Sequence, residues 1–203
     1  MRGLLIAVEG LDKSGKTTHI AKLVDRLDNV QLIKFPCRET KIGMTINEYL
    51  QERTHLDSRC AHLLFSANRW ELAEKIKSLL LDGITVILDR YVYSGIAYSV
   101  SNGIPFDWCI TSDIGLPKPD YVIYITRDAK FDGEERYEHA QFQQLVADCF
   151  NKMISPDWII VDNNRPFDDV HEELYNHIKR FMNNRDDTTT CKMHLIHPSL
   201  FLK

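Results

Sequence analysis

One short segment near the N-terminus constrains the fold of this chain more than any other. Residues 10–17 have the sequence GLDKSGKT, which matches the pattern G-x-x-x-x-G-K-[ST], and the apolar run LLIAV at 4–8 comes just before it. This pattern binds phosphate when it follows a buried strand and opens a helix, because its glycines turn backbone N–H groups inward and the helix N-terminus adds positive potential. We therefore expect a phosphate-binding loop here rather than a chance glycine-rich turn.

The rest of the chain alternates between the patterns of buried strands and of helices. Short apolar runs predict strands at 4–8, 30–35, 84–88, 121–125 and 158–161. Helical spacing predicts helices at 16–27, 45–51, 56–81, after 93, and at 106–110, 137–153 and 170–181. Such alternation is typical of an α/β fold, a five-stranded parallel sheet with helices on both faces as in P-loop NTPases. The 203 residues fit one domain at 1–182, with a charged loop at about 127–136 and a polar tail at 183–203.

Composition argues against several classes of function. A formal net charge of -4 disfavours the wrapping of duplex nucleic acid, which proteins hold mainly through Lys and Arg on the phosphates. The five cysteines include no C-x-x-C pair, which is typical of reduced thiols in an intracellular protein. No run approaches the roughly 20 apolar residues that span a bilayer, and the N-terminal apolar run is too short for a secretory signal. We expect no nucleic-acid partner, no membrane contact and a cytoplasmic or nucleocytoplasmic protein.

The phosphate loop itself carries chemistry. Lys16 is placed to reach the β- and γ-phosphates of a nucleoside triphosphate, and the Thr17 hydroxyl is placed to ligate Mg²⁺. The pair Asn151-Lys152 lacks the aspartate of the N-K-x-D guanine signature, so we do not expect guanine recognition by that device. Asp12 is unusual in such a loop, and its carboxylate either lies close to an approaching acceptor or caps the helix.

Charged residues also follow two other predicted strands. Asp89 and Arg90 follow the third strand, and Arg38 follows the second. Because ligands of open parallel sheets lie at the carboxyl ends of strands, Asp89 is a candidate for holding Mg²⁺ through water and Arg90 for clamping a transferring phosphoryl group. The alternative for Asp89 and Arg90 is an ion pair that caps the end of the strand. Arg38 offers a planar fork for an acceptor phosphate, although a solvated loop arginine explains Arg38 alone equally simply.

A base-binding pair is a further hypothesis. Phe65 and Arg69 are four residues apart and so share one helix face, where an aromatic ring could stack on a base and the guanidinium could bond its edge. Core packing is the better explanation for Phe65 alone. If the acceptor is a monophosphate, whose second pKa is about 6, no general base is needed to activate it. Positioning and charge neutralisation by a lysine, arginines and Mg²⁺ are then sufficient.

Six segments belong together as a set: EGLDKSGKTT at 9–18, FPCRET at 35–40, LLFSANRWE at 63–71, LDRYVYSGIAY at 88–98, GLPKPD at 115–120 and GEERYEHAQFQQ at 133–144. In this order they resemble the thymidylate kinase family, in the eukaryotic and large-DNA-virus branch of the P-loop nucleoside monophosphate kinases. The resemblance implies transfer of the γ-phosphoryl group of ATP to dTMP, giving dTDP and ADP for dTTP biosynthesis, with Mg²⁺ as cofactor. It also implies that the loop at 127–136 is the family's LID.

The resemblance further implies a role for each matching residue. ATP would contact Gly10, Ser14, Gly15, Lys16, Thr17 and Thr18, with Arg165 beside the adenine, and Mg²⁺ would be served by Thr17 and Asp89. The dTMP site would comprise Phe35, Arg38, Phe65, Arg69, Arg90, Ser94, Tyr98, Tyr137 and Gln143. Within it Phe65 would stack on thymine, Arg69 would bond the base edge and Tyr98 would block a ribose 2′-hydroxyl. Catalytic roles fall to Asp12, Lys13, Lys16, Arg90 and Arg136.

This chain departs from the family pattern at one loop position, and the sequence leaves the family's dimer interface open. Lys13 stands where many relatives have an arginine in the loop, so the charge at the transition state would come from Lys13 or from Arg127 or Arg136 of the LID. The family usually forms homodimers along its long helices, and Leu63 and Trp70 in the predicted helix serve either such an interface or the core.

Two rival functions remain on the sequence alone. A deoxynucleoside kinase shares the loop, but it would need a carboxylate base near a neutral 5′-hydroxyl, whereas Arg38 and Arg90 favour an acceptor phosphate. A regulator that binds ATP without turnover is the other, and the intact Lys16, Thr17 and Asp89 count against it.

Overall fold

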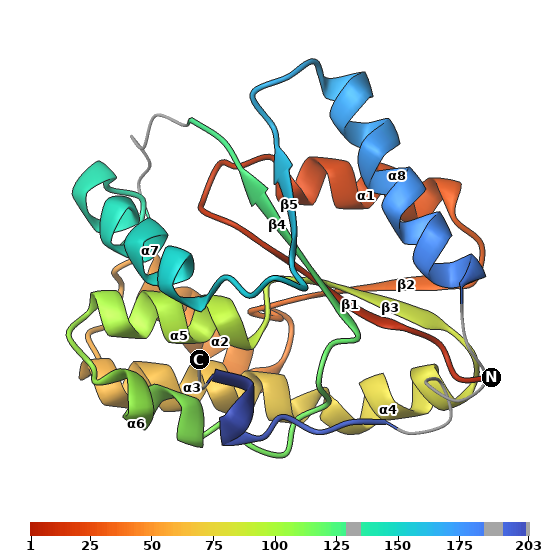
Figure 1. The fold of residues 1–203 in the computed structure, drawn as a ribbon. Coiled ribbons are helices and arrows are strands. Elements are labelled where there is room, and N and C mark those ends of the chain that lie inside the picture. Colours follow the sequence, from red (N-terminus) through yellow and green to blue (C-terminus); the bar gives the residue numbers. More distant parts are fainter. Residues whose placement is uncertain (129–134, 185–192, 202–203) are drawn as a thin grey trace.

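A parallel sheet forms the centre of the computed structural model, which describes residues 1–128, 135–184 and 193–201 (Figure 1). Its strands are β1 (Leu5–Glu9), β2 (Val30–Lys34), β3 (Thr85–Asp89), β4 (Tyr121–Thr126) and β5 (Ile159–Asp162). They lie in the order β2-β3-β1-β4-β5, and every neighbouring pair is parallel. In the centre, Leu5 of β1 lies opposite Val86 and Ile6 opposite Tyr121. The predicted fold class is thereby confirmed.

Helices cover both faces of this sheet, as the uninterrupted apolar strands require. Figure 1 shows α1 (Lys16–Arg26) and α8 (Phe167–Asn183) on one face, with α4 (Ala73–Leu81), α5 (Val92–Ser101) and α7 (Ala140–Met153) on the other. The first layer packs Ile20, Leu23, Leu174 and Ile178 on the sheet. The second packs Ile76, Leu80, Ile96, Val146 and Phe150. All five residues of β1 and of β3 are buried between the two layers.

Three further helices flank the second layer, and several ends differ from the expected ones. They are α2 (Lys41–Leu50), α3 (Ser58–Glu71) and α6 (Phe106–Thr111). The continuous helix expected at 56–81 is interrupted at Leu72, whose N–H bonds to the carbonyl of Arg69 only three residues back. The apolar pattern continues across this residue, so periodicity alone could not reveal the break. Helix α2 starts earlier than expected because the Thr40 hydroxyl caps it by accepting a hydrogen bond from the Gly43 N–H.

The segment at 193–201 returns to the body of the domain. Leu195 forms an antiparallel bridge with Pro117, and Ile196 is only 2% exposed. Phe201, at the end of the short 3₁₀ helix Pro198–Phe201, packs edge-on against Tyr93 and Phe106. This packing differs from the polar tail expected over 183–203, because the apolar side chains of the segment join the core. The polar run at 185–192 lies outside the described residues.

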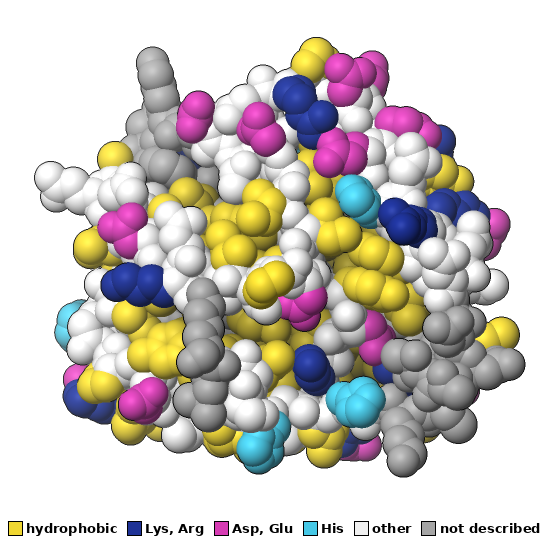
Figure 2. Space-filling model, in the orientation of Figure 1, with side chains coloured by type: hydrophobic (Ala, Val, Ile, Leu, Met, Phe, Trp, Pro, Cys, Tyr) yellow, Lys and Arg dark blue, Asp and Glu magenta, His cyan; other side chains and the backbone are white. Residues whose placement is uncertain are grey.

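The surface shows how charge and apolar side chains are distributed. In Figure 2 hydrophobic side chains form a broad band across the middle of one face, and acidic side chains gather at the top, where α8 begins. Asp168 and Asp169 lie in the first turn of α8, where negative charge complements the helix dipole. In the described part of the chain, no helix combines the length and the apolar character needed to cross a membrane. The described cysteines, Cys37, Cys60, Cys109 and Cys149, are free thiols.

Candidate active site

One cavity of about 530 Å³ opens at the carboxyl ends of β1, β2 and β3, where the sequence placed its charged residues. It joins the phosphate loop to the expected acceptor residues. Of the predicted residues, its wall contains Asp12, Lys13, Ser14, Gly15, Lys16, Thr17, Thr18, Phe35, Arg38, Phe65, Arg69, Asp89, Arg90, Ser94, Tyr98 and Tyr137. Lys34, His62, Asn102, Arg127, Glu135 and Glu138 also line it. Residues scattered over the sequence therefore meet in a single space.

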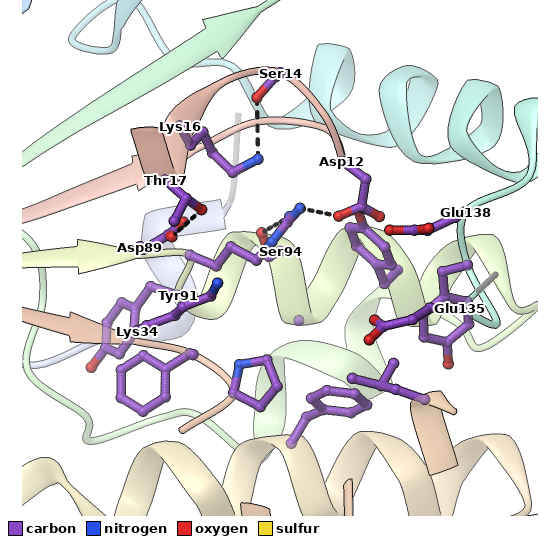
Figure 3. Close-up of a pocket in the computed structure, with 18 of the residues that line it drawn as sticks. Asp12, Ser14, Lys16, Thr17, Lys34, Asp89, Tyr91, Ser94, Glu135 and Glu138 are labelled. Carbon is purple, nitrogen blue, oxygen red and sulfur yellow. Dashed lines mark hydrogen bonds and ion pairs between the residues drawn. The ribbon is translucent and has the colours of Figure 1, made fainter. Parts of the chain in front are cut away.

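The phosphate loop has the geometry of an anion cradle. Gly15 begins α1 in the left-handed region at φ 88°, and no side chain caps the helix N-terminus. The first N–H groups of a helix lack partners within the helix, so those of α1 are available for a ligand. Lys16 Nζ lies 3.1 Å from Ser14 Oγ, as Figure 3 shows. Burial, together with the nearby charge of Arg90, lowers the pKa of Lys16 to about 7.

Thr17 and Asp89 lie together beside this lysine. The Thr17 hydroxyl donates to Asp89 Oδ2 at 2.7 Å, and both groups appear side by side in Figure 3. An alcohol and a carboxylate are the hard oxygen ligands that suit Mg²⁺, which is commonly held by one or two carboxylates plus substrate phosphates. Within the described ranges no group of three or more His, Cys, Asp or Glu side chains could hold a metal by itself. The donor set therefore fits a magnesium ion that arrives with a nucleotide.

Asp12 and Arg90 form the junction between the two halves of the cavity. Arg90 Nη2 lies 2.5 Å from Asp12 Oδ1, and Arg90 Nη1 donates to the Gly10 carbonyl at 2.9 Å and to Ser94 Oγ at 3.2 Å. Arg90 adopts φ 68°, the left-handed region that a non-glycine residue seldom occupies. Burial opposes ionisation of Asp12, yet the charges of Arg90 and Lys16 outweigh it and lower the pKa of this carboxyl. The ion pair holds the arginine at the end of β3.

The same carboxylate anchors the start of α7. Tyr98 Oη donates to Asp12 Oδ2 at 2.8 Å, and Gln143 Nε2 donates to the same oxygen at 2.7 Å. Gln143 is fully buried and also accepts from the Asp12 N–H at 3.2 Å. Tyr98 lies against Tyr137 in an edge-to-face contact, with ring centroids 5.5 Å apart. Helix α7 follows the segment at 127–136, so this network ties the phosphate loop to the helix after that segment.

Sequence reasoning missed two buried carboxylates. Glu9, the last residue of β1, accepts from the Tyr91 N–H at 2.9 Å and from Ser94 Oγ at 2.5 Å, and burial raises its pKa. Asp113, which follows α6 and is fully buried, bonds Arg69 Nη2 at 2.7 Å. Glu9 directly precedes the glycine motif and could have been noticed there. No local signal marks Asp113.

Asp113 explains the position of Arg69. The guanidinium donates through both Nε and Nη2 to the two carboxylate oxygens, and the pair is almost fully buried. Gly95 lies against the other side, where an added Cβ would be 2.8 Å from both terminal nitrogens. Arg69 reaches the cavity beside Phe65, so the structure brings together the pair that the helical spacing placed on one face.

Arg38 is held differently, on an exposed part of the wall. It makes two parallel bonds to Glu135, at 2.8 and 2.9 Å, and a third to Asn47 at 2.8 Å. The Arg38 and Glu135 side chains are 40% and 33% exposed. Glu135 follows the undescribed part of the LID, and Figure 3 shows its carboxylate on the same side of the cavity as Glu138.

Four predicted residues are not part of the cavity wall: Gly10, Gln143, Arg136 and Arg165. Arg136 donates to the backbone carbonyls of Tyr49 at 3.1 Å and Thr54 at 3.3 Å, so its guanidinium faces α2. Arg165 bonds the Asp162 carbonyl at 3.1 Å and the Glu173 carboxylate. In this structure neither guanidinium lines the cavity, whereas Lys13 and Arg127 do. Residues 129–134 of the LID lie outside the described part of the chain.

A phosphate loop, a Thr–Asp pair and arginines around one cavity define a P-loop phosphotransferase that acts on nucleotides. The family model described as Thymidylate kinase matches residues 8–174. A "Thymidylate kinase" of Dictyostelium discoideum is 43% identical over 185 residues, covering 85% of this chain and 83% of the relative. A "Putative thymidylate kinase 251L" of Invertebrate iridescent virus 6 is 41% identical, covering 89% and 90%. The chain belongs to the thymidylate kinase family.

A solved structure agrees with this assignment. The thymidylate kinase of Candida albicans superposes with a TM-score of 0.85 at 41% identity, over 97% of this chain and 99% of that one. Eukaryotic and viral relatives at this level of identity confirm the resemblance seen in the motifs. The chain is accordingly an enzyme that phosphorylates dTMP to dTDP, in a family that uses ATP.

Proposed function

We propose that this enzyme passes the γ-phosphoryl group of ATP·Mg²⁺ to the dTMP phosphate by positioning and charge neutralisation, without a general base, and so serves dTTP biosynthesis. The observation that carries the proposal is the single cavity that connects Lys16 to Arg38 and Phe65. A donor and an acceptor bound at its two ends would meet at Asp12 and Arg90. A monophosphate with a second pKa of about 6 is already a nucleophile at neutral pH, so no proton has to be removed from it.

On the donor side, the proposed contacts follow the phosphate loop. Backbone N–H groups of Gly10 to Thr18 and the Lys16 ammonium would hold the phosphates, and Thr17 with Asp89 would hold Mg²⁺. When bound, the ion would neutralise charge on the transferring group. Support comes from the uncapped start of α1 and from the 2.7 Å contact between the two metal-binding candidates.

On the acceptor side, arginine forks would hold the phosphate. Arg38 and Arg90 line the cavity from the segments that follow β2 and β3, and each can make parallel bonds to a phosphate. Phe65 would stack on the base and Arg69, fixed by Asp113, would donate to its edge. Phe35, Ser94, Tyr137 and Gln143 would complete the site. Tyr98, whose hydroxyl donates to Asp12, would fill the space of a ribose 2′-hydroxyl.

For the remaining transition-state charge we propose Lys13, with Arg127 from the LID. Both line the cavity. A role for Arg136 would require its guanidinium to leave the carbonyls of Tyr49 and Thr54. A contact of Arg165 with adenine would require a similar release from Glu173.

We also propose that the enzyme forms a homodimer along α3. Leu63 and Trp70 are 48% and 40% exposed on this helix, and Ile114 beside it is 38% exposed. Size-exclusion chromatography with light scattering tests the dimer directly, and charged substitutions at Leu63 and Trp70 should then give a monomer. A wild-type monomer at micromolar concentration would contradict it.

ADP formation in the presence of different acceptors tests the reaction. The panel is dTMP, dUMP, dGMP, thymidine and no acceptor. Turnover should be greatest with dTMP and absent without an acceptor. Turnover with thymidine alone would refute the phosphate roles of Arg38 and Arg90, and ATP binding with no turnover on any acceptor would favour a regulator.

A further inference from the structure

A buried network of side chains joins the phosphate loop to α8. Its two central members, Asn163 and His19, are not among the proposed substrate contacts. Asn163, in the loop between β5 and α8, is 7% exposed, and its Nδ2 donates to the Ser14 carbonyl at 2.7 Å. Its Oδ1 lies 3.0 Å from His19 Nε2. His19, on α1, is 1% exposed and stacks on Phe167 with ring centroids 4.3 Å apart. Three elements therefore meet behind the phosphate loop.

The hydrogen-bonding groups of this network admit only one arrangement. The Ser14 carbonyl can only accept, so the Asn163 amide must turn its NH₂ group toward it. The Asn163 oxygen then faces His19, whose Nε2 must carry the proton and donate. His19 Nδ1 is buried and has no hydrogen-bond partner in the described part of the chain, so a proton on Nδ1 would be left without an acceptor. His19, with a proton on Nε2, thus fixes the orientation of the Asn163 amide.

The Ser14 carbonyl matters because of the peptide plane it belongs to. In a trans peptide the C=O of one residue and the N–H of the next point in opposite directions. When Asn163 holds the Ser14 carbonyl away from the cavity, the Gly15 N–H is turned toward it. Gly15 lines the cavity, and a Cβ there would lie 2.3 Å from Asn163 Nδ2, so the close approach also requires glycine. One hydrogen bond behind the loop therefore aims a donor inside it.

The loop that carries Asn163 is itself fixed on both sides. The Asn163 N–H donates to the Thr126 carbonyl at the end of β4, at 2.8 Å. The next residue, Asn164, accepts from the Asp128 N–H at 3.0 Å, at the beginning of the LID. Asn163 consequently presses on the phosphate loop from a rigid support rather than from a free loop.

We propose that Asn163 and His19 are a positioning pair for the donor nucleotide, which holds the Ser14–Gly15 peptide so that the Gly15 N–H faces the phosphates of ATP. The inference rests on the proposed role of the phosphate loop in ATP binding. Neither side chain has to touch the nucleotide. The pair acts on the donor and leaves the acceptor contacts at Arg38, Phe65 and Arg69 unaltered.

The first test is Asn163→Ala. ADP binding, measured by calorimetry, and the KM for ATP should each weaken about tenfold, as expected when one buried hydrogen bond that orients a ligand-binding group is lost. The KM for dTMP should not change. Unchanged ADP affinity, or equal weakening of both substrates, would overturn the proposal.

A matched pair of substitutions at His19 separates orientation from packing. His19→Gln keeps an amide N–H that can donate to Asn163 but loses the ring, whereas His19→Phe keeps stacking on Phe167 but loses the donor. We expect the His19→Gln variant to retain ADP affinity and the His19→Phe variant to lose ADP affinity. The reverse order would refute the proposal. This pair decides the matter even if Asn163→Ala does not fold. Because ADP binding needs no acceptor, the comparison also stands if the wild-type enzyme fails to turn over dTMP.

Discussion

The two halves of the cavity are prepared for ligands in different ways. The donor half is one contiguous loop that offers backbone N–H groups, and its main cation, Lys16, is buried and bonded to Ser14 of the same loop. In the acceptor half, each arginine is held by a carboxylate from a distant segment: Arg90 by Asp12, Arg69 by Asp113 and Arg38 by Glu135. A backbone cradle needs no counter-charge when empty, whereas a set of arginines does. The acceptor half therefore depends on ion pairs that a ligand must exchange or bypass.

The largest effect should come from the cation of the donor half. Lys16→Met removes the charge that faces the phosphates, and kcat should fall about 10²- to 10³-fold, the usual loss for one group that stabilises a transition state. The measurement is steady-state ADP formation at saturating ATP and dTMP. Lys77→Met is the matched control, because Lys77 lies on α4 and pairs with the exposed Glu74. A kcat within the error of the wild type would remove Lys16 from the mechanism.

The next effect concerns stability and the buried acceptor pair. Asp113→Asn leaves the Arg69 charge buried without its counter-charge, and the free energy of unfolding should drop by roughly 3 kcal/mol. Urea denaturation measures it. Glu135→Gln serves as the comparison, since an exposed pair contributes only about 0–1 kcal/mol. Equal losses of unfolding free energy in the two variants would mean that burial does not make the Arg69–Asp113 pair more important for stability than the Arg38–Glu135 pair.

At pH 8, the number of protons taken up on ligand binding should differ between the two halves of the cavity. Lys16, with a pKa of about 7, is mostly neutral in the empty enzyme at this pH. Donor phosphates favour its charged form, so ADP binding should take up close to one proton, whereas dTMP binding to arginines should take up almost none. Calorimetry in buffers of different ionisation enthalpy gives both numbers. The same uptake for both ligands would refute this account of Lys16.

The smallest effect should come from the exposed acceptor pair. Glu135 occupies the fork of Arg38 in the empty enzyme, and Glu135→Gln should free it. The KM for dTMP should decrease about two- to fivefold at low salt, in keeping with the small energy of an exposed ion pair. The difference should shrink at high ionic strength. An increased KM would show instead that Glu135 helps to bind the acceptor.

The same contrast explains what could be predicted from the sequence. The phosphate loop is a contiguous pattern next to a buried strand, so its residues and their arrangement could be predicted. Arg90 could be placed at the cavity because the geometry of strand ends is known, whereas helical spacing placed Phe65 and Arg69 only on one helix face and the family resemblance assigned them to the site. Their partners could not be predicted, since the contact of Arg69 with Asp113 joins segments with no common pattern. The orientation of Arg136 toward the carbonyls of Tyr49 and Thr54 depends on tertiary packing and was equally inaccessible.

Two features of the fold escaped prediction for related reasons. Periodicity continues across Leu72, where the helix breaks, because the apolar face is maintained on both sides of it. The segment around Ile196 looked like a polar tail because its few apolar residues follow a long polar run. Only the bridge between Leu195 and Pro117 and the ring contact between Phe201 and Tyr93 show that this segment packs on the core.

The central position of β1 has a consequence for the order of folding during synthesis. The strand that supports the phosphate loop precedes the other four strands in the chain, but its hydrogen-bonding neighbours, β3 and β4, come much later. Parallel pairing between distant segments is slow to form and leaves strand edges exposed until it does. A nascent polypeptide that ends before β4 would contain the entire phosphate-binding motif and yet could not hold it in place. The nucleotide site should therefore appear late and in one step, which protects an unfinished enzyme from binding ATP.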